Sequence, residues 1–191
     1  MAPLSRENLG KFLLDGKETA ETRQAMLWLE RELGISPTQE NMHLVRAMAA
    51  VKAGTPADAV ARILDWKEFE HFGASIFRAR GFEVTENVTM TKPRGQVDLL
   101  VRTPSLALVV DCKHWAHAKG GSALSKVADD QARRADRLRT KMPRVEPMVV
   151  VILALSDEAT RYANGAAVVP VYALGDFMDN LDAYADGLTR H

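Results

Sequence analysis

Two short apolar runs with charged residues at their ends constrain this chain more than any other feature. Val97 to Val101 and Leu106 to Val110 are separated by a Thr-Pro-Ser turn and predict a β-hairpin. Side chains alternate along a strand, so Asp111 and Lys113 share one face at the end of the second strand. Asp98 lies near the start of the first strand and can be brought beside them. The pattern therefore predicts two carboxylates and an ammonium group gathered at the end of buried strands.

Unpaired charge is costly to bury, so this cluster suggests a purpose other than stability. A divalent metal ion and a developing negative charge would both fit between such groups. The tripeptide Asp-x-Lys alone is a weak signal, because it also occurs at Asp15-Gly16-Lys17 and Asp65-Trp66-Lys67 in polar surroundings near predicted helix ends. Only Asp111-Cys112-Lys113 ends an apolar strand that follows a strand with its own acidic residue.

Length and composition predict a globular protein of the cytoplasm. The 191 residues suffice for one domain of ordinary size and a small appendage, and 47% hydrophobic with 26% charged residues exclude a disordered chain. A single cysteine excludes an internal disulfide and fits a reducing compartment. The start of the chain lacks a signal-peptide pattern, and no apolar run approaches the roughly 20 residues of a membrane span. We therefore expect a cytoplasmic protein with no membrane partner.

The formal net charge of zero hides an uneven distribution of charge. Residues 113–144 carry 9 basic and 3 acidic side chains, whereas residues 145–191 carry 2 basic and 7 acidic ones. A basic segment thus directly follows the charged cluster, and local fields matter more for an anionic partner than the total. A solvated helix face is the plain alternative for such a segment.

Residues 1–64 predict a small all-helical domain. Ser5 can cap a first helix ending near Gly16, and a second helix is expected from about Glu18 to Gly34. Ser36-Pro37-Thr38-Gln39 predicts the start of a third helix, with Ser36 as the cap, and Thr55-Pro56-Ala57-Asp58 the start of a fourth. We find no metal ligands or phosphate-binding loop here, and the sequence leaves DNA contact, dimerisation and partner docking open as roles.

From Asp65 the pattern changes to alternating helices and strands. Asp65-Trp66-Lys67-Glu68 predicts a capping box and a helix to about Arg80. Because capping explains Glu68, Glu70 is the acidic residue at the edge of the apolar face without a structural role, although an exposed helix carboxylate is its plain alternative. Phe82 to Thr89 alternates like a half-buried strand, and a loop containing Pro93 and Gly95 leads into the hairpin.

The second half of the chain also predicts alternating helices and strands. A helix is expected from about Ser122 to Lys141, with Leu124, Ala128, Ala135 and Leu138 facing inward and Gln131 as the one polar member of that row. Gln131 is either a core amide satisfied by backbone or a site residue. The remaining predictions are a strand from Pro147 to Leu155 buried on both faces, a short helix around Glu158 to Ala163, a strand from Val168 to Tyr172 and a helix from Gly175 to about Tyr184.

This order of elements and acids resembles the PD-(D/E)xK nuclease superfamily, closest to Mrr-like restriction endonucleases and next to archaeal Holliday-junction resolvases. The residues that carry the resemblance are Phe69-Glu70, Arg80-Gly81-Phe82-Glu83-Val84, Gln96-Val97-Asp98 and Val110-Asp111-Cys112-Lys113. Val97 stands where the superfamily name implies proline, and Gln96 where Mrr-like chains commonly have glycine. Asp111 stands where many of them have glutamine, which restores the superfamily's acidic ligand.

The resemblance implies an α/β fold with a restriction-endonuclease-like αβββαβ core and a mixed central sheet in residues 65–191. It implies hydrolysis of DNA phosphodiester bonds with Mg²⁺, or Mn²⁺ in its place, held by Glu70, Asp98, Asp111 and the Cys112 carbonyl. Lys113 would orient or help to deprotonate the attacking water, and Gln131 would position the water or the phosphate. The residues expected to grip the DNA backbone are His114, His117, Lys119, Lys126, Arg133, Arg134 and Arg137.

Three alternatives stay open at this point. A homodimer is expected, and two active sites facing opposed strands would favour a structure-specific, junction-resolving nuclease. A non-catalytic DNA-binding protein could keep the fold and lose the hydrolytic activity. Nuclease sites that have lost activity usually lack an acid or the lysine, whereas this chain retains Glu70, Asp98, Asp111 and Lys113. The acids could also form structural ion pairs only, and this is the weakest account because buried pairs contribute little to stability.

Overall fold

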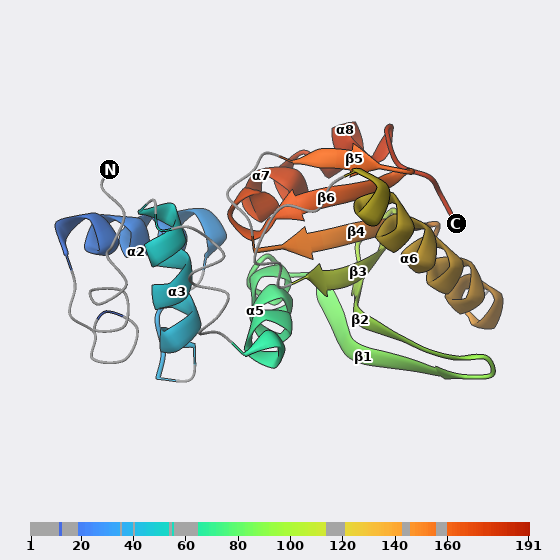
Figure 1. The fold of residues 1–191 in the computed structure, drawn as a ribbon, viewed down its shortest axis with the longest axis horizontal. Helices are drawn as coiled ribbons and strands as arrows, with labels where there is room; N and C mark the ends of the chain where they lie inside the picture. Colours follow the sequence, from blue (N-terminus) through green and yellow to red (C-terminus); the bar gives the residue numbers. More distant parts are fainter. Residues whose placement is uncertain are drawn as a thin grey trace.

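The computed structural model describes residues 12, 19–34, 36–39, 41–53, 55, 65–113, 121–142, 146–155 and 160–191. The described elements, in chain order, are α2 (Ala20–Leu33), α3 (Met42–Lys52), α5 (Trp66–Ala79), β1 (Glu83–Thr91), β2 (Arg94–Arg102), β3 (Ala107–Lys113), α6 (Gly121–Lys141), β4 (Met148–Ala154), β5 (Arg161–Ala163), β6 (Ala166–Pro170), a 3₁₀ turn (Val171–Ala173), α7 (Leu174–Asp179) and α8 (Leu181–Ala185) (Figure 1). None of the described helices is both long and apolar enough to cross a membrane.

The centre of the molecule is a mixed six-stranded sheet in the order β1-β2-β3-β4-β6-β5. β1, β2 and β3 pair antiparallel, β3, β4 and β6 pair parallel, and β5 returns antiparallel to β6. The helix α6 makes the crossover between the parallel strands β3 and β4, as such a connection requires. The predicted αβββαβ order and mixed sheet are therefore confirmed.

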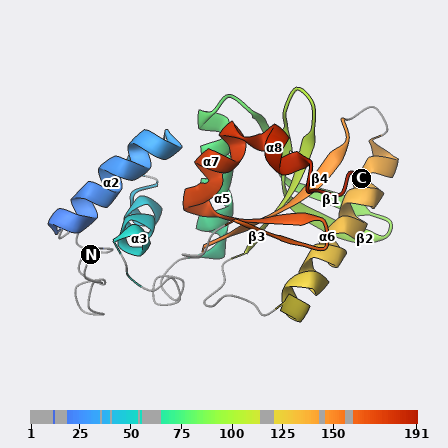
Figure 2. The ribbon, with the colours of Figure 1, turned by 90° about the horizontal axis from the view of Figure 1, so that it is seen from above.

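Helices cover both faces of this sheet. α5, α7 and α8 pack on one face together with strand residues such as Leu99, Val110 and Val151, and α6 packs on the other face against Val109, Val150 and their neighbours (Figure 2). Strand alternation explains the two separate apolar clusters, because successive side chains enter opposite layers. β4 is buried along its whole length, as the uninterrupted apolar run predicted.

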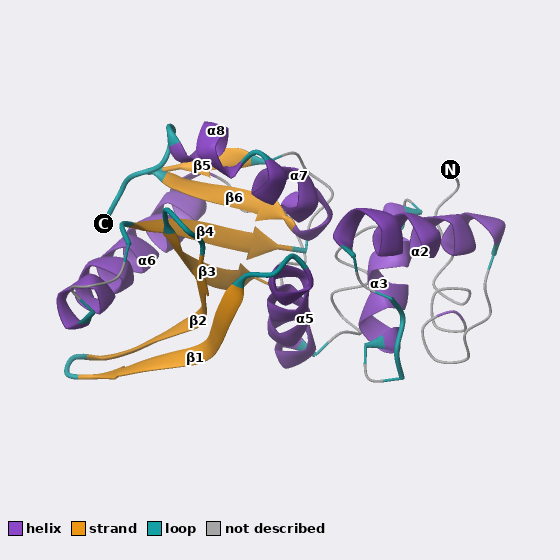
Figure 3. Cartoon of the chain, turned by 180° about the vertical axis from the view of Figure 1, so that it is seen from behind, coloured by secondary structure: helices purple, strands orange, loops and turns teal. Residues whose placement is uncertain are grey.

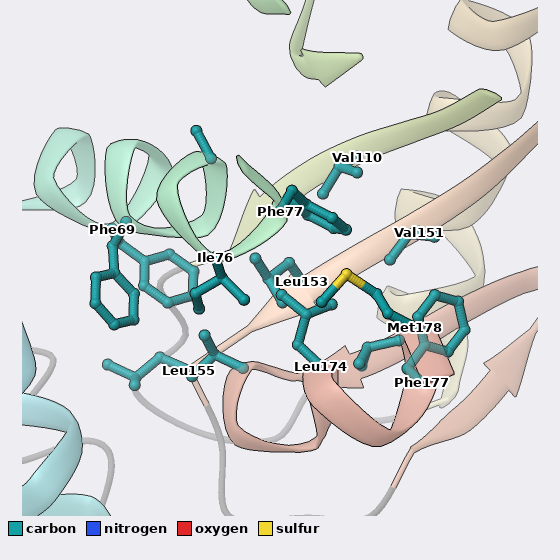
Figure 4. Packing of buried hydrophobic residues seen from close by; sticks show 14 of the residues in the cluster. Phe69, Ile76, Phe77, Val110, Val151, Leu153, Leu155, Leu174, Phe177 and Met178 are labelled. Atoms are coloured by element: carbon teal, nitrogen blue, oxygen red, sulfur yellow. The ribbon is translucent and has the colours of Figure 1, made fainter. Parts of the chain in front are cut away.

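Aromatic side chains form a large part of the core beneath α5. Phe69, Ile76 and Phe77 of α5 meet strand residues and α7 residues, including Leu174, Phe177 and Met178 (Figure 4). Each buried side chain of this size contributes about 1.5–3 kcal/mol relative to an exposed position. The predicted Asp65–Glu68 capping box is present, because Glu68 Oε2 accepts from the Asp65 amide at 3.1 Å and Asp65 Oδ1 accepts from the Lys67 amide at 2.7 Å.

Several local predictions are wrong. α3 is opened by Thr38 and Asn41, whose side chains accept from each other's amides, whereas the Ser36 hydroxyl donates to Glu30 Oε1. The loop expected around Pro93 is short, because β1 and β2 continue to Thr91 and from Arg94. Arg161–Ala163 is an edge strand rather than part of a helix, since it pairs with β6. The last predicted helix is divided into α7 and α8 at Asn180.

The predicted helices at Ser5 to Gly16 and after Thr55 lie outside the described residues. α2 begins after Thr19, whose hydroxyl accepts from the Thr22 amide at 3.2 Å, and it ends at Gly34 with φ of 68°. α2 and α3 stand beside α5, away from the central strands (Figure 3). The division into domains at residue 64 stays a prediction.

Candidate active site

The first element of the site is a bend shared by β1 and β2 at Asn87 and Asp98. The strand register places Asn87 opposite Asp98, between the pairs Glu86–Leu99 and Val88–Val97, and Asn87 has a positive φ of 55°. The bend changes which face the following residues use: Leu99 packs toward α5, whereas Val97 packs toward α6. Asparagine tolerates this left-handed backbone better than a branched residue would. The bend therefore decides where Asp98 points.

Asp98 is held at the point where β2 leaves β3. The regular pairing of these strands runs from Leu99–Val110 to Arg102–Ala107. Next to it, Asp98 Oδ2 accepts a hydrogen bond from the Cys112 amide at 2.8 Å. The Asp98 carboxylate thus accepts the hydrogen bond that a backbone carbonyl of β2 would accept in a regular sheet. This bond fixes the Asp98 side chain and leaves its Oδ1 for a ligand.

Asp111 is the most deeply buried acid of the group, with 2% of its surface exposed. Lys113 Nζ lies 3.0 Å from Oδ1 and 2.8 Å from Oδ2, and Gln131 Nε2 donates to Oδ1. Among the described residues Oδ2 accepts no well-directed hydrogen bond beyond this ion pair. Burial raises the pKa of Asp111 to about 6, and the Lys113 charge only partly offsets the effect of burial.

Glu70 approaches from α5 on the other side of the strands. It is 9% exposed, and its pKa rises to about 7 because burial disfavours the carboxylate and because Asp98 and Asp111 repel it. Close packing of α5 brings it there: a Cβ added to Gly73, one turn later, would lie 2.8 Å from Leu153 Cδ2. The charges of Asp98, Asp111 and Lys113 all act on the Glu70 carboxyl, so Glu70 lies within electrostatic range of these three residues. That the four residues form one catalytic site stays a prediction.

Cys112 serves this site with its backbone rather than with its thiol. Its side chain points toward α5, away from Asp111 and Lys113, as strand alternation predicted. Burial and the nearby acids raise the pKa of the Cys112 thiol well above its ordinary value, so the thiol stays protonated at neutral pH. Its amide is bound by Asp98, and a metal-binding role for its carbonyl stays a prediction.

The donor chemistry of the site suits a hard divalent cation. Carboxylate oxygens are the ligands that Mg²⁺ prefers, and a cation would offset both the burial and the mutual repulsion that raise the pKa of Glu70 and Asp111. In this conformation no group of three or more His, Cys, Asp or Glu side chains within the described ranges is arranged to hold a metal. Asp111 is engaged by Lys113 and Gln131, so binding would require these side chains to turn.

The helix α6 supplies the opposite wall through Gln131 and Arg134. The five inward positions predicted for this helix are all buried, and Gln131 is one of them. Arg134, predicted as part of the basic surface, turns toward the site, with its Nη1 3.8 Å from Asp111 Oδ1 and 34% of its side chain exposed. The signal that could have indicated this is spacing, because residues three apart share a helix face.

The other predicted DNA-contacting residues are placed differently. Lys126 and Arg133 are exposed on α6, and Arg133 pairs with Asp130. Arg137 donates to the Arg133 carbonyl at 3.0 Å and lies beside Gly95 of β2. His114, His117 and Lys119 lie outside the described residues.

Comparison with known protein families covers the region that holds the site. A family model for the catalytic domain of Mrr, described as restriction endonuclease, matches residues 61–173. These residues include Glu70, Asp98, Asp111, Lys113 and Gln131. An uncharacterised protein from Archaeoglobus fulgidus is 25% identical over 122 residues, which cover 62% of this chain and 93% of that protein. No solved structure matches the chain significantly.

Proposed function

Because this chain belongs to the restriction endonuclease family of the Mrr catalytic domain, we propose that it is a metal-dependent endonuclease that hydrolyses DNA phosphodiester bonds. The observation that supports the proposal is the proximity of four charged side chains: Asp111 and Lys113 at the end of β3, Asp98 at the bend of β2, and Glu70 on the second turn of α5. Burying Glu70 and Asp111 beside the half-buried Asp98 disfavours stability, so a bound cation and an anionic substrate are the natural reason for this arrangement.

Glu70, Asp98, Asp111 and the Cys112 carbonyl would hold the metal, with Mg²⁺ as the first candidate. When bound, a divalent cation supplies positive charge that polarises the phosphodiester and lowers the pKa of bound water. Three carboxylates exceed the two nearby cations, Lys113 and Arg134, by one negative charge when all are ionised. This excess negative charge favours the binding of a cation at the site.

The protein's own groups would orient the reactants. Lys113 Nζ is a compact cation 2.8 Å from Asp111 Oδ2, where it can hold the attacking water and offset charge that develops on the phosphate. Gln131 fixes Asp111 from the α6 side through its hydrogen bond to Oδ1. Arg134, half turned to solvent, is suited to binding the scissile phosphate. We propose that the protein acts in the cytoplasm as a homodimer.

The test is cleavage of supercoiled, linear, single-stranded and four-way-junction DNA in Mg²⁺, Mn²⁺ or EDTA. Wild type should cut in the presence of metal and not in EDTA, and Asp111→Asn should lower the rate by roughly 10²-fold or more. Asp182→Asn, an exposed acid on α8, is the matched control and should cut like wild type. The preferred substrate separates a restriction-type from a junction-type role.

A second measurement reports on the metal without cleavage. Mg²⁺ should raise the thermal midpoint of wild type, because a ligand that binds only the folded state stabilises it, and should leave Asp111→Asn unchanged. Wild type that binds DNA but neither cuts it nor responds to any divalent cation would replace the nuclease with a DNA-binding protein of the same fold.

A further inference from the structure

The β1–β2 hairpin continues well past the sheet. β2 pairs with β3 only over Leu99–Arg102, and in the part of the chain that the structure describes, residues 94–97 pair with β1 alone. Residues 88–97 thus form a two-stranded ribbon, which we call the arm. The arm leaves the sheet at the Asn87–Asp98 bend and extends below α6, with its turn at the edge of the molecule (Figures 1 and 3).

The arm is anchored along one face. Met90 and Val97 are buried, and they belong to the same apolar cluster as Leu138 of α6. An isolated two-stranded hairpin is only marginally stable in water, so this packing against α6 is what holds the arm in place. The arm is therefore an ordered extension and can present its outer side chains in a defined geometry.

The outer side of the arm is basic and rich in hydrogen-bonding groups. The exposed polar residues of the arm are Thr89, Thr91, Lys92, Arg94 and Gln96. Residues 87–97 contain two cations and no acid. On the inner side, next to Met90, Arg137 of α6 lies close to the arm, with its Nη1 3.9 Å from the position of a Cβ built on Gly95. Lysine, arginine, threonine and glutamine side chains of this kind are the usual contacts to DNA phosphates.

We propose that the arm is a second DNA-contacting element, which binds the phosphate backbone of the duplex whose scissile bond lies at Asp98 and Asp111. This inference rests on the proposed nuclease function. Arg94 is four residues from Asp98, about 13 Å at the rise of a strand. That distance corresponds to the axial rise of about four base pairs, so one duplex can reach both. The arm would fix the register of the DNA without reading its sequence.

The test is the salt dependence of DNA binding, measured in EDTA so that no cleavage occurs. Lys92→Gln/Arg94→Gln should make the slope of log affinity against log salt less steep by about 1.8, because each lost phosphate contact contributes about 0.9. The matched control is Arg23→Gln/Lys67→Gln, which removes the same charge from exposed positions on α2 and α5. The control should keep the wild-type slope.

The outcomes separate the two proposals. A wild type that neither binds nor cuts DNA would overturn the proposed function and the arm's role with it. A wild type that cuts DNA, with an arm variant of unchanged slope and unchanged thermal midpoint, would overturn the arm's role alone. Arg94→Gln by itself should reduce the slope by about half as much as the double variant, which guards against a global effect of two substitutions.

Discussion

Among single residues, Glu70 and Asp111 are distinguished by carboxyl groups with a raised pKa. The pKa of Glu70 rises from an ordinary 4.5 to about 7, and that of Asp111 from 3.8 to about 6, chiefly because both groups are buried. The folded protein then binds these protons more tightly than the unfolded chain. Their contribution to stability is favourable at low pH and is lost as the pH rises from about 4 to about 7.

Glu70→Gln should remove the contribution of Glu70 to the pH dependence of the free energy of unfolding. In EDTA at pH 8, the variant should be more stable than wild type by about 1–2 kcal/mol, because solvent near Glu70 screens part of the effect, and the difference should disappear near pH 4. Urea unfolding at a series of pH values measures it. Glu83→Gln, an exposed acid on β1, is the control and should show no such difference. Parallel pH profiles of wild type and Glu70→Gln would contradict the prediction.

Arg134→Ala should raise the pKa of Asp111 further, because its guanidinium is one of the two cations that lower it. We expect a fall of roughly 10–100-fold in the cleavage rate at saturating DNA, the usual size for loss of a residue that supports a ligand. Arg133→Ala removes the same charge one residue earlier, where the side chain pairs with Asp130 instead. It should keep the rate at saturation, and equal losses in both variants would argue against a special role for Arg134.

At the scale of elements, the bend in β1 and β2 couples the arm to Asp98. Asn87 accepts a hydrogen bond from Gln96 at 2.8 Å and takes the left-handed backbone that the bend requires. The same two strands thus supply both an acid of the site and the proposed DNA contact. A change in the bend should therefore affect both.

Asn87→Val should straighten the ribbon, because a β-branched residue is strained by about 1–2 kcal/mol in this conformation. We expect a loss of stability of that size and reduced cleavage through displacement of Asp98. Asn87→Gly accepts the positive φ and should retain most of both properties. Thr85→Val places the same residue in an extended part of β1 and is the control. If Asn87→Val and Thr85→Val behave alike in unfolding and cleavage assays, the bend does not govern the site.

At the scale of the whole molecule, one apolar cluster joins the N-terminal helices to the sheet. Leu29 of α2 and Leu44 of α3 belong to the same cluster as Phe72 of α5 and Leu174 of α7. This cluster therefore contains described residues from both sides of the predicted boundary at residue 64. We therefore expect the full chain to unfold in a single cooperative transition.

Leu44→Ala should lower the midpoint of that single transition, at a cost of about 2–5 kcal/mol, because Leu44 is 4% exposed. Leu27→Ala is the control on the neighbouring helix, where the leucine is 61% exposed, and should change the midpoint little. Calorimetry measures both. Two separate transitions, with only the first affected by Leu44→Ala, would mean that residues 1–64 unfold on their own.

The sequence alone determined what depends on local periodicity and capping. The Asp65–Glu68 box, the inward row of α6 with Gln131, and the strands that carry Asp98 and Asp111 follow from spacing within one element. The family resemblance added the way these elements assemble into one mixed sheet, and the family match over residues 61–173 agrees with that fold.

Only the tertiary structure decided what depends on partners distant in the chain. Arg161–Ala163 is a strand because β6 offers it an edge, and Arg134 turns inward because Asp111 lies across from α6. The arm is ordered because α6 covers Met90 and Val97, and the bend at Asn87 turns Val97 toward α6 while Leu99 faces α5. Local sequence cannot determine these features, since each one is stabilised by side chains from another element of the chain.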